Sequence, residues 1–569
     1  MRLAWVRFGF VVVMLAAMSL TLIPSVVRSA PASFRKELVL GNIQEPSGLN
    51  ALTSVASTEV QFMPLFTAYS FLRSDRFEQI NEYVTQVPTL ANGLWKVFPD
   101  GKMEVTWKLR PGMKWHDGQP FTTEDFKFTW EVYKNPKAPL GTRPVLDDID
   151  SVAFPDALTM IVHYKRPSSQ ANLLWLGAFA APLPKHVVAP MLERVGIERY
   201  LEIPYGSDAG QTIGVGPYVF KSWQRGVQMV FEANPNYHLG RPVLDRIVVR
   251  FFTDVNALVT TVLAGQIDAV SPNPGGIPLA QALEIDDRIQ RGQLQKYRVA
   301  FYDAPASEAY IINNDSPLLQ DRRVRQALLL AIDREGITQT VFRGRVSVAH
   351  SYLPAKHPWY LQDIRKYNYD PPAARRLLDE AGWRAGPDGI RRNAAGERLS
   401  LVVTVPAGDR TRERIQEIIQ AQWKDVGVDM AIDNKPIRLI LAELWGTGRR
   451  PPDLLNLSHP IDEFNDIDVI YHSENVPAVG QRGRNYLRWK NPQYDAVLNE
   501  YAKTFDVKKR KELSQRFQRM WGEDVPILLI YTFVGASVVR DDLIGFKPLG
   551  LACVPGCYTW NARSWRWSR

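Results

Sequence analysis

Apolar and polar residues alternate in several short stretches of the chain, and each such stretch predicts a β-strand. The clearest alternation is that of Leu399, Leu401, Val403 and Val405. Apolar residues then recur at helical spacing from position 415 to 426, and Gly427 separates them from a second apolar run that ends at Ile432. A strand, helix, strand unit of an α/β fold is therefore expected between residues 399 and 432.

Helix starts and ends are marked at several other places. Thr122 and Asp125 have the spacing of a capping box, which predicts a helix beginning at this point. Asp321 precedes an apolar stripe in the same way and predicts a second capped helix. Gly265 and Gly382 each follow a short apolar stripe and predict helix ends.

A tight hairpin is predicted just before the first of these helices. The turn-forming pairs Pro111-Gly112 and Asp117-Gly118 flank the short run from Met113 to His116. In isolation, His116 and Asp117 look like a catalytic pair. A turn stabilised by side-chain hydrogen bonds is the better interpretation of these two residues.

The glycine-rich stretch from Gly214 to Tyr218 resembles part of a dinucleotide-binding fingerprint. However, no complete G-x-G-x-x-G motif is present, and alternating residues that predict strands follow where the fingerprint needs a helix. A nucleotide-binding function is therefore excluded for this segment.

The N-terminus has the pattern of a secretory signal peptide. Arg2 and Arg7 precede an uncharged apolar run from Phe8 to Ile23. This run is shorter than the roughly 20 residues that a membrane-spanning helix needs, although an uncleaved anchor is the alternative. Small residues at positions 30 and 32 predict cleavage before Ser33, so residues 1–32 are expected to be removed.

The two cysteines agree with an exported protein. No cysteine lies near the cleavage site, so the mature chain is expected to be soluble outside the cytoplasm, without a lipid anchor. Cys553 and Cys557 flank a Pro-Gly turn and are expected to form a local disulfide in an oxidising compartment. The alternative is a reduced loop, and a metal or redox pair would need His or acidic neighbours that are absent here.

Charge and motif content exclude several functions. The net charge of +9 comes from basic residues that are interspersed with acidic ones, so no nucleic-acid partner is predicted. The eight histidines include no i, i+4 pair beside acids, so neither a metal nor another cofactor is expected. Motifs of zinc proteases, serine hydrolases, β-lactamases and P-loop proteins are missing, which argues against an enzyme.

Several segments, in order, resemble the large solute-binding proteins that serve peptide and nickel ABC importers. The strongest resemblance is that of residues 107–125, WKLRPGMKWHDGQPFTTED. The others are Gly214 to Tyr218 with Trp223, NPNY at 234–237 with Pro242, Leu244 and Asp245, AGQID at 264–268, Ile312-Asn313, DRRVRQA at 321–327 with AIDR at 331–334, and LLDEAGW at 377–383. On this basis the chain is identified as a member of bacterial extracellular solute-binding protein family 5.

The resemblance implies an α/β periplasmic-binding-protein fold of two lobes joined by a hinge, in the class with an extra small domain. By analogy, lobe I is expected at residues 34–76, 211–309 and 532–569. The accessory domain is expected at 77–210, and lobe II at 310–531.

The resemblance also suggests where a solute binds. Peptide binders of this family place an aspartate near a Trp-rich segment of the second lobe, where it pairs with the peptide's amino terminus. Asp462, in the stretch 458–464, is the best match, although the usual tryptophan and the following Asp-Pro are missing. Trp445 is expected as a wall of the cleft, and Arg449 and Arg450 as partners of a carboxylate.

The function implied is that of a periplasmic binder without catalytic activity. We expect the protein to act as a monomer that captures a peptide or similar small solute between its lobes and delivers it to ABC permease subunits with their ATPase. The alternatives are a ligand-dependent adaptor for a membrane sensor and, from another functional class, an extracellular hydrolase.

Overall fold

The computed structural model describes residues 36–53, 57–74, 78–140, 148–169, 171–172, 181–272, 276–441, 452–460, 471–477, 485–548 and 558–568. Lys36–Ser568 form one compact unit. The expected signal peptide, residues 1–32, lies outside the described residues, and its cleavage stays a prediction. Within the described ranges, no helix is long and apolar enough to cross a membrane.

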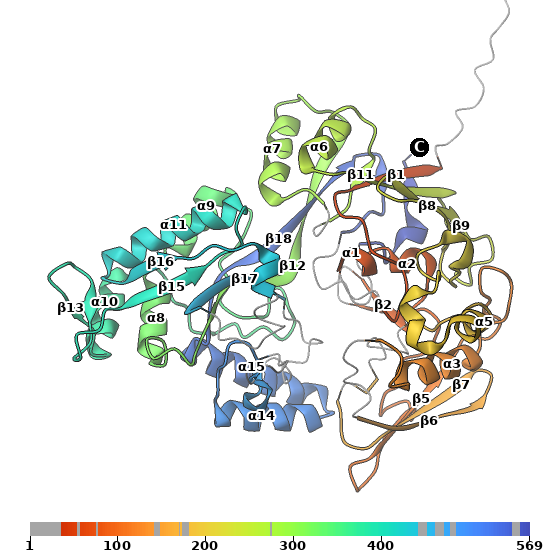
Figure 1. Cartoon of the computed structure of the whole chain (residues 1–569), viewed down its shortest axis with the longest axis horizontal. Helices are drawn as coiled ribbons and strands as arrows, with labels where there is room; N and C mark the ends of the chain where they lie inside the picture. The colour runs from red at the N-terminus through yellow and green to blue at the C-terminus, as the bar shows by residue number, and fades with distance from the viewer. Residues whose placement is uncertain are drawn as a thin grey trace, which may run out of the picture. The chain divides into compact units, whose positions relative to one another are not determined.

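A mixed sheet, ten-stranded within the part of the chain that the structure describes, forms the centre of the fold (Figure 1). In spatial order, its strands are β16 (Asp429–Ile432), β15 (Ser400–Thr404), β17 (Leu454–Pro460), β12 (Tyr297–Ile312), β18 (Ile527–Arg540), β11 (Ala269–Val270), β1 (Glu37–Asn42), β10 (Arg246–Phe251), β9 (Gln228–Ala233) and β8 (Tyr218–Gln224). The mixture of parallel and antiparallel pairs in one sheet confirms the predicted α/β class.

Two long antiparallel strands, β12 and β18, connect the two halves of this sheet (Figure 1). Their pairing runs from Tyr297 opposite Arg540 to Ile311 opposite Ile527. The register shifts between Asp303 and Ser307, and again after Glu308. The predicted boundaries at 309–310 and 531–532 fall on these strands, and the residue bounds of the lobes stay a prediction.

The predicted strand, helix, strand unit is confirmed. β15 and β16 pair in parallel, and α11 (Arg410–Asp425) connects them. Ile419 and Trp423 of α11 are fully buried, and Gly427 has a φ of +85° where the chain turns into β16. Such a left-handed conformation suits glycine because it has no Cβ.

A second sheet of four strands leads into the segment with the strongest family resemblance, which begins at the end of β5. Its spatial order is β4 (Trp95–Val97), β5 (Met103–Lys108), β7 (Thr159–Tyr164) and β6 (Ile149–Asp156). The predicted capping box is confirmed, because Thr122 and Asp125 cap α3 (Thr123–Lys134) reciprocally. The predicted tight hairpin is also present, since Phe121 donates to the Met113 carbonyl and Trp115 donates to that of Gln119.

The other described elements are three small sheets and the remaining α-helices. Three two-stranded sheets are formed by β2 (Phe71–Arg73) with β3 (Gln79–Asn81), β13 (Arg384–Ala385) with β14 (Arg391–Arg392), and β19 (Leu543–Ile544) with β20 (Arg566–Trp567). The remaining α-helices are α1 (Ser57–Val60), α2 (Met63–Phe66), α5 (Lys185–Val195), α6 (Val255–Leu263), α7 (Leu279–Gln290), α8 (Arg322–Leu330), α9 (Arg334–Phe342), α10 (Pro371–Glu380), α12 (Ile437–Leu441), α14 (Pro492–Lys503) and α15 (Val507–Asp524). The predicted cap, Asp321, precedes α8 as its N-cap. The glycines predicted to end helices follow α6 (Gly265) and α10 (Gly382).

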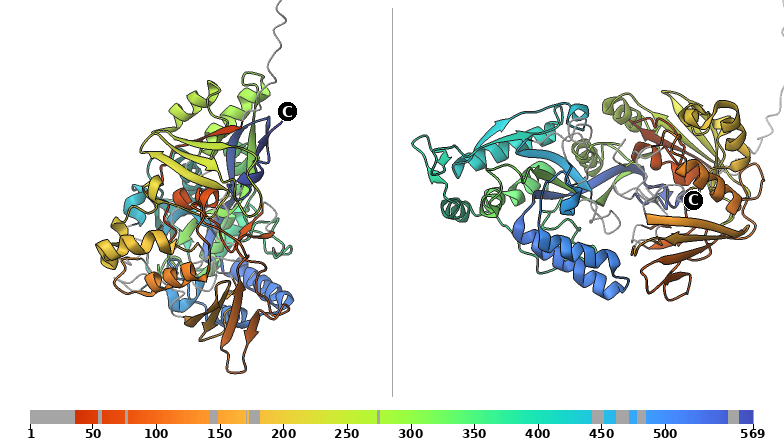
Figure 2. Two further views of the ribbon diagram at one scale, coloured as in Figure 1. Left: turned by 90° about the vertical axis from the view of Figure 1, so that its right-hand side faces the viewer. Right: turned by 60° about the horizontal axis from the view of Figure 1, so that its bottom comes forward.

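Separate apolar cores cover the two faces of the sheet beside β17. One core packs α8, α9, α10 and α11 against β15 and β18, and Trp423 is fully buried in it. The other core packs α14 and α15 against β12 and β17, with Tyr494 and Phe517 at its centre. Helices α14 and α15 lie side by side (Figure 1 and the right-hand view of Figure 2). β17 is thus covered on both faces, which fixes the direction of each of its side chains.

Candidate functional site

Strand β17 carries the described part of the segment that resembles a solute contact. β15 pairs in parallel with both β16 and β17, so these three strands end at the same edge of the sheet. In α/β sheets, ligands bind at the carboxyl ends of parallel strands. β17 ends at Pro460, two residues before Asp462. This edge is therefore the candidate functional site.

Ser458, near the end of β17, is part of a partly buried polar cluster. It lies directly opposite Glu308 of β12 in the strand pairing, and its hydroxyl donates to Glu308 Oε2 over 3.2 Å. The same hydroxyl accepts a hydrogen bond of 2.8 Å from Nη2 of Arg412. Arg412 lies in the first turn of α11, whose N-cap Asp409 accepts from the Arg412 backbone N–H.

Arg412 and Glu308 form a two-point ion pair. Nη2 of Arg412 donates to Oε2 of Glu308 over 3.0 Å, and Nε lies 2.8 Å from Oε1, in electrostatic contact rather than in a well-aligned hydrogen bond. The Glu308 side chain is 3% exposed, whereas that of Arg412 is 17% exposed. Because a buried carboxylate is costly without a partner, Arg412 is what allows Glu308 to occupy an apolar strand.

The charge of Arg412 is maintained at this site. Burial acts to lower its pKa, but the Glu308 carboxylate, together with Asp409 and Tyr531, raises the pKa above the ordinary arginine value. Nη1 of Arg412 has no hydrogen-bond or ion-pair partner among the described residues. Within the part of the chain that the structure describes, this end of a charged side chain therefore has no hydrogen-bond acceptor.

His459 points to the opposite face of β17. Its Nε2 lies 2.6 Å from the hydroxyl of Tyr471, and its Nδ1 lies 3.3 Å from that of Tyr486. The residue is 2% exposed, and burial lowers the pKa of its imidazole to about 3. His459 is therefore neutral and serves to anchor the end of β17 to the second core.

The residues that the sequence suggested for the site lie outside the described residues. These are Trp445, Arg449, Arg450 and Asp462, together with Cys553 and Cys557 of the expected disulfide. Their roles stay predictions. Sequence reasoning missed Glu308 and Arg412. The signal for Glu308 was a single acid within the apolar run from Ala306 to Ile312, since a charge in a buried strand requires a partner.

The segment with the strongest resemblance has a structural role at His116. Its Nδ1 accepts from the Gly214 N–H over 3.2 Å, and its Nε2 donates to the Gly216 carbonyl over 3.1 Å. Burial lowers the pKa of His116 to about 4, which keeps the imidazole neutral. The expected side-chain hydrogen bond in the turn is confirmed by Asp117, which accepts from the Gln119 N–H. No catalytic pair forms, because Asp117 contacts His186 instead.

A second buried acid, Glu82, lies in the same region. Its carboxylate accepts from the Tyr69 N–H over 3.1 Å and from the Tyr237 hydroxyl over 2.9 Å. Among the described residues it forms no ion pair within 4.0 Å. Burial raises the pKa of Glu82 from 4.5 to about 7, although Arg563 and Arg110 act in the opposite direction.

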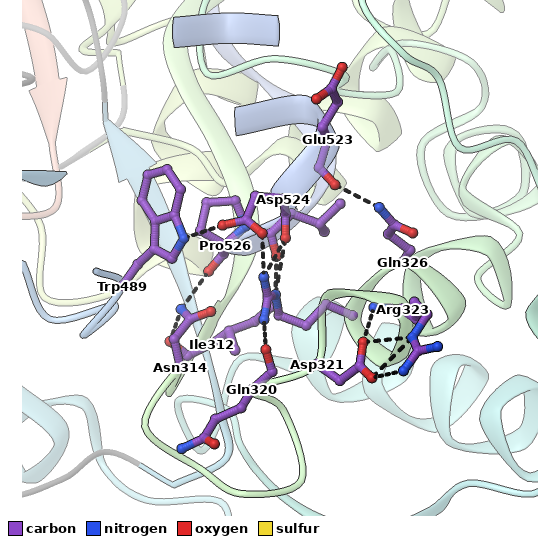
Figure 3. A network of polar contacts seen from close by, with 12 residues as sticks. Ile312, Asn314, Gln320, Asp321, Arg323, Gln326, Trp489, Glu523, Asp524 and Pro526 are labelled. Carbon is purple, nitrogen blue, oxygen red and sulfur yellow. Dashed lines mark hydrogen bonds and ion pairs between the residues drawn. The ribbon is translucent and has the colours of Figure 1, made fainter. Parts of the chain in front are cut away.

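The motif at residues 321–327 forms another structural network (Figure 3). Arg325 donates to the carbonyls of Asp524 and Val525, and Gln326 donates to that of Glu523. Trp489 donates to the Asp524 carboxylate. These bonds satisfy the end of α15, whose last carbonyls have no partner within the helix. The motif therefore joins α8 to the end of α15.

In the part of the chain that the structure describes, no group of three or more His, Cys, Asp or Glu residues is arranged to hold a metal ion. Arg412 supplies a charged donor, and Ser458 and Glu308 orient it.

Comparisons with known proteins identify the family of this chain. Residues 85–447 match the family model of "Bacterial extracellular solute-binding proteins, family 5 Middle". The chain is 29% identical over 529 residues to the oligopeptide-binding protein AppA of Bacillus subtilis, covering 90% of this chain and 89% of AppA.

Solved structures show the same fold. The oligopeptide-binding protein of Thermus thermophilus, complexed with a pentapeptide, is 26% identical, with a TM-score of 0.73 over 94% of this chain and 96% of that one. NikZ of Campylobacter jejuni, in complex with Ni(L-His), is 22% identical, with a TM-score of 0.73 over 94% and 99% of the two chains. The chain therefore belongs to the bacterial extracellular solute-binding proteins of family 5 and has their two-lobed α/β fold.

Proposed function

We propose that this protein captures a peptide or a similar small solute outside the cytoplasm and delivers it to an ABC permease. It acts as a periplasmic monomer and catalyses no reaction. The observation that carries the proposal is the cluster of Arg412, Glu308 and Ser458 at the edge where three parallel strands end. The names of its relatives, which include oligopeptide-binding proteins, support the same solute class.

The cluster suits a ligand with exposed carbonyl or carboxylate oxygens. Nη1 of Arg412 has no acceptor among the described residues and is proposed to donate to the ligand, while Glu308 holds the guanidinium in one orientation. Preorganisation of this kind lowers the entropy lost on binding. Asp462 follows two residues after β17 and is proposed to pair with the amino group of the same ligand. A peptide offers both kinds of group.

Binding is proposed to act through hinge closure. A solute that contacts both lobes stabilises a closed form, and a permease recognises this form. β12 and β18 are the candidates for the hinge, because both strands run through the two halves of the main sheet and change register between Asp303 and Ser307.

A metal chelate is the alternative solute, since NikZ holds Ni(L-His). Native mass spectrometry of the mature protein, purified without refolding, distinguishes the two. A set of extra masses that fragment into amino acids is expected. Stoichiometric nickel without peptide would contradict the proposed solute class.

Calorimetry with a peptide identified in this way tests the site itself. Arg412→Gln is expected to weaken binding about tenfold or more, because a charged hydrogen bond contributes about 1.5–3 kcal/mol. Asp462→Asn is expected to weaken binding of free peptides more than that of N-acetylated ones. The matched control is Arg414→Gln, an exposed arginine on the same helix. Equal affinities of the Arg412 and Arg414 variants would rule out the proposed contact.

A further inference from the structure

Arg334, the first residue of α9, is a buried cation without a carboxylate partner. The residue is 3% exposed and forms no ion pair among the described residues. Its Nη1 donates to the carbonyls of Ala349 and Leu529, and its Nη2 donates to that of Tyr367. Nε is buried and has no hydrogen-bond partner. One N–H of a buried charge is thus unsatisfied, which is a costly arrangement.

A small cavity adjoins this guanidinium. Its volume is about 20 Å³, which exceeds the roughly 10–15 Å³ that one water-sized particle requires. Its lining includes Arg334, His350, Arg365, Tyr367, Gly522 and Leu529, and no acidic residue belongs to it. The cavity therefore has room for a single small particle that accepts hydrogen bonds.

The surroundings of the cavity have an excess of positive charge. Arg365 is exposed, forms no ion pair among the described residues, and lies over the ring of Tyr367 at 4.9 Å. Burial, followed by the charges of Arg334 and Lys366, lowers the pKa of His350 to about 4, so this histidine is neutral at pH 7. Exposed Glu335 is the acid whose charge acts on Arg334.

We propose that this cavity binds one small monovalent anion of the chloride class, which accepts the Nε–H of Arg334 and neutralises its charge. A water molecule would satisfy the N–H but would leave the charge uncompensated. An uncompensated buried charge is strongly destabilising. Arg412, Glu308 and Ser458 do not line this cavity, and the proposal does not rest on the proposed transport function.

Crystals of the mature protein soaked in sodium bromide test the site directly. Bromide replaces chloride and scatters anomalously, so an anomalous peak within hydrogen-bond distance of Arg334 Nε is expected. A cavity without such a peak, filled by water alone, would overturn the proposal.

Thermal unfolding in solution gives a second readout. At equal ionic strength, chloride and bromide are expected to raise the Tm above its value in gluconate by about 1–3 °C, with saturation. Arg365→Gln should abolish at least about half of this shift, because it removes a charge at the cavity while leaving Arg334 in place. Arg519→Gln, a nearby exposed arginine paired with Asp363, is the matched control and should keep the shift. Identical Tm values in the three salts would contradict the proposal.

Discussion

Two regions of this protein bury a carboxylate, and they stabilise it in different ways. Glu82 accepts hydrogen bonds from a backbone N–H and a tyrosine hydroxyl, both neutral donors. Glu308 faces the guanidinium of Arg412 and the hydroxyl of Ser458. Among the described residues, the carboxylate of Glu82 forms no ion pair, whereas that of Glu308 is paired with Arg412.

The difference separates the scaffold from the candidate site. His116, Arg325 and Gln326 come from segments with strong family resemblance, and all three donate to backbone carbonyls. Arg412 and Glu308 come from outside those segments. The residues by which the family is recognised thus hold loops and helix ends together, and the proposed solute contacts depend on other residues.

The largest expected effect comes from the scaffold region. A Cβ on Gly214 would lie 1.8 Å from the carbonyl oxygen of Phe66, so backbone must shift to accept it. Gly214→Ala is expected to lower the free energy of unfolding by about 3 kcal/mol or more, as measured by urea denaturation. In the control, Gly48→Ala, the nearest atom would be 3.6 Å away. If Gly214→Ala lowered the free energy of unfolding no more than Gly48→Ala does, the contrast between the regions would disappear.

An intermediate effect is expected at the ion pair. Glu308→Gln removes the main counter-charge of Arg412 and should cost about 2–3 kcal/mol of unfolding free energy. This loss is smaller than that expected for a fully buried pair, because Arg412 is partly exposed and because a second carboxylate remains near it. Oδ2 of Asp409 lies 3.6 Å from Nε of Arg412. The double variant with Arg412→Gln should recover part of the loss in a double-mutant cycle. Simple additivity of the two single losses would show that the pair is not coupled.

The smallest effect concerns the pH dependence of stability. Glu82 has a folded-state pKa of about 7, above the ordinary 4.5, so the folded protein binds its proton more tightly than the unfolded chain does. Its stabilising contribution is complete below about pH 4.5 and is lost as the pH rises through 7. Between pH 5 and 8, this loss is of the order of 1–2 kcal/mol of unfolding free energy. Glu82→Gln should remove it, which is measured as a flatter dependence of Tm on pH.

The matched control for this prediction is Glu78→Gln, at an exposed carboxylate in the same segment. This variant should keep the wild-type pH profile. If the profile of Glu82→Gln kept the wild-type decline above pH 6, a different group would be responsible.

Local elements could be read from the residues because their causes are local. The capping box of Thr122 and Asp125, the cap at Asp321 and the unit of β15, α11 and β16 follow from side-chain spacing within a few turns. The family assignment likewise rested on short segments in order, and it is confirmed by the match over residues 85–447. The candidate site could not be predicted in this way.

The sequence by itself determined the α/β class, the helix caps and the family, since each depends on neighbours along the chain. Only the tertiary structure brought Glu308, Arg412 and Ser458 together, across up to 150 positions of sequence. It also joined His116 to Gly214 across 98 positions. Such contacts depend on strand order and helix placement, which neighbours along the chain do not determine. A charged residue in a buried strand indicates that a partner exists, but the sequence does not show which residue that partner is.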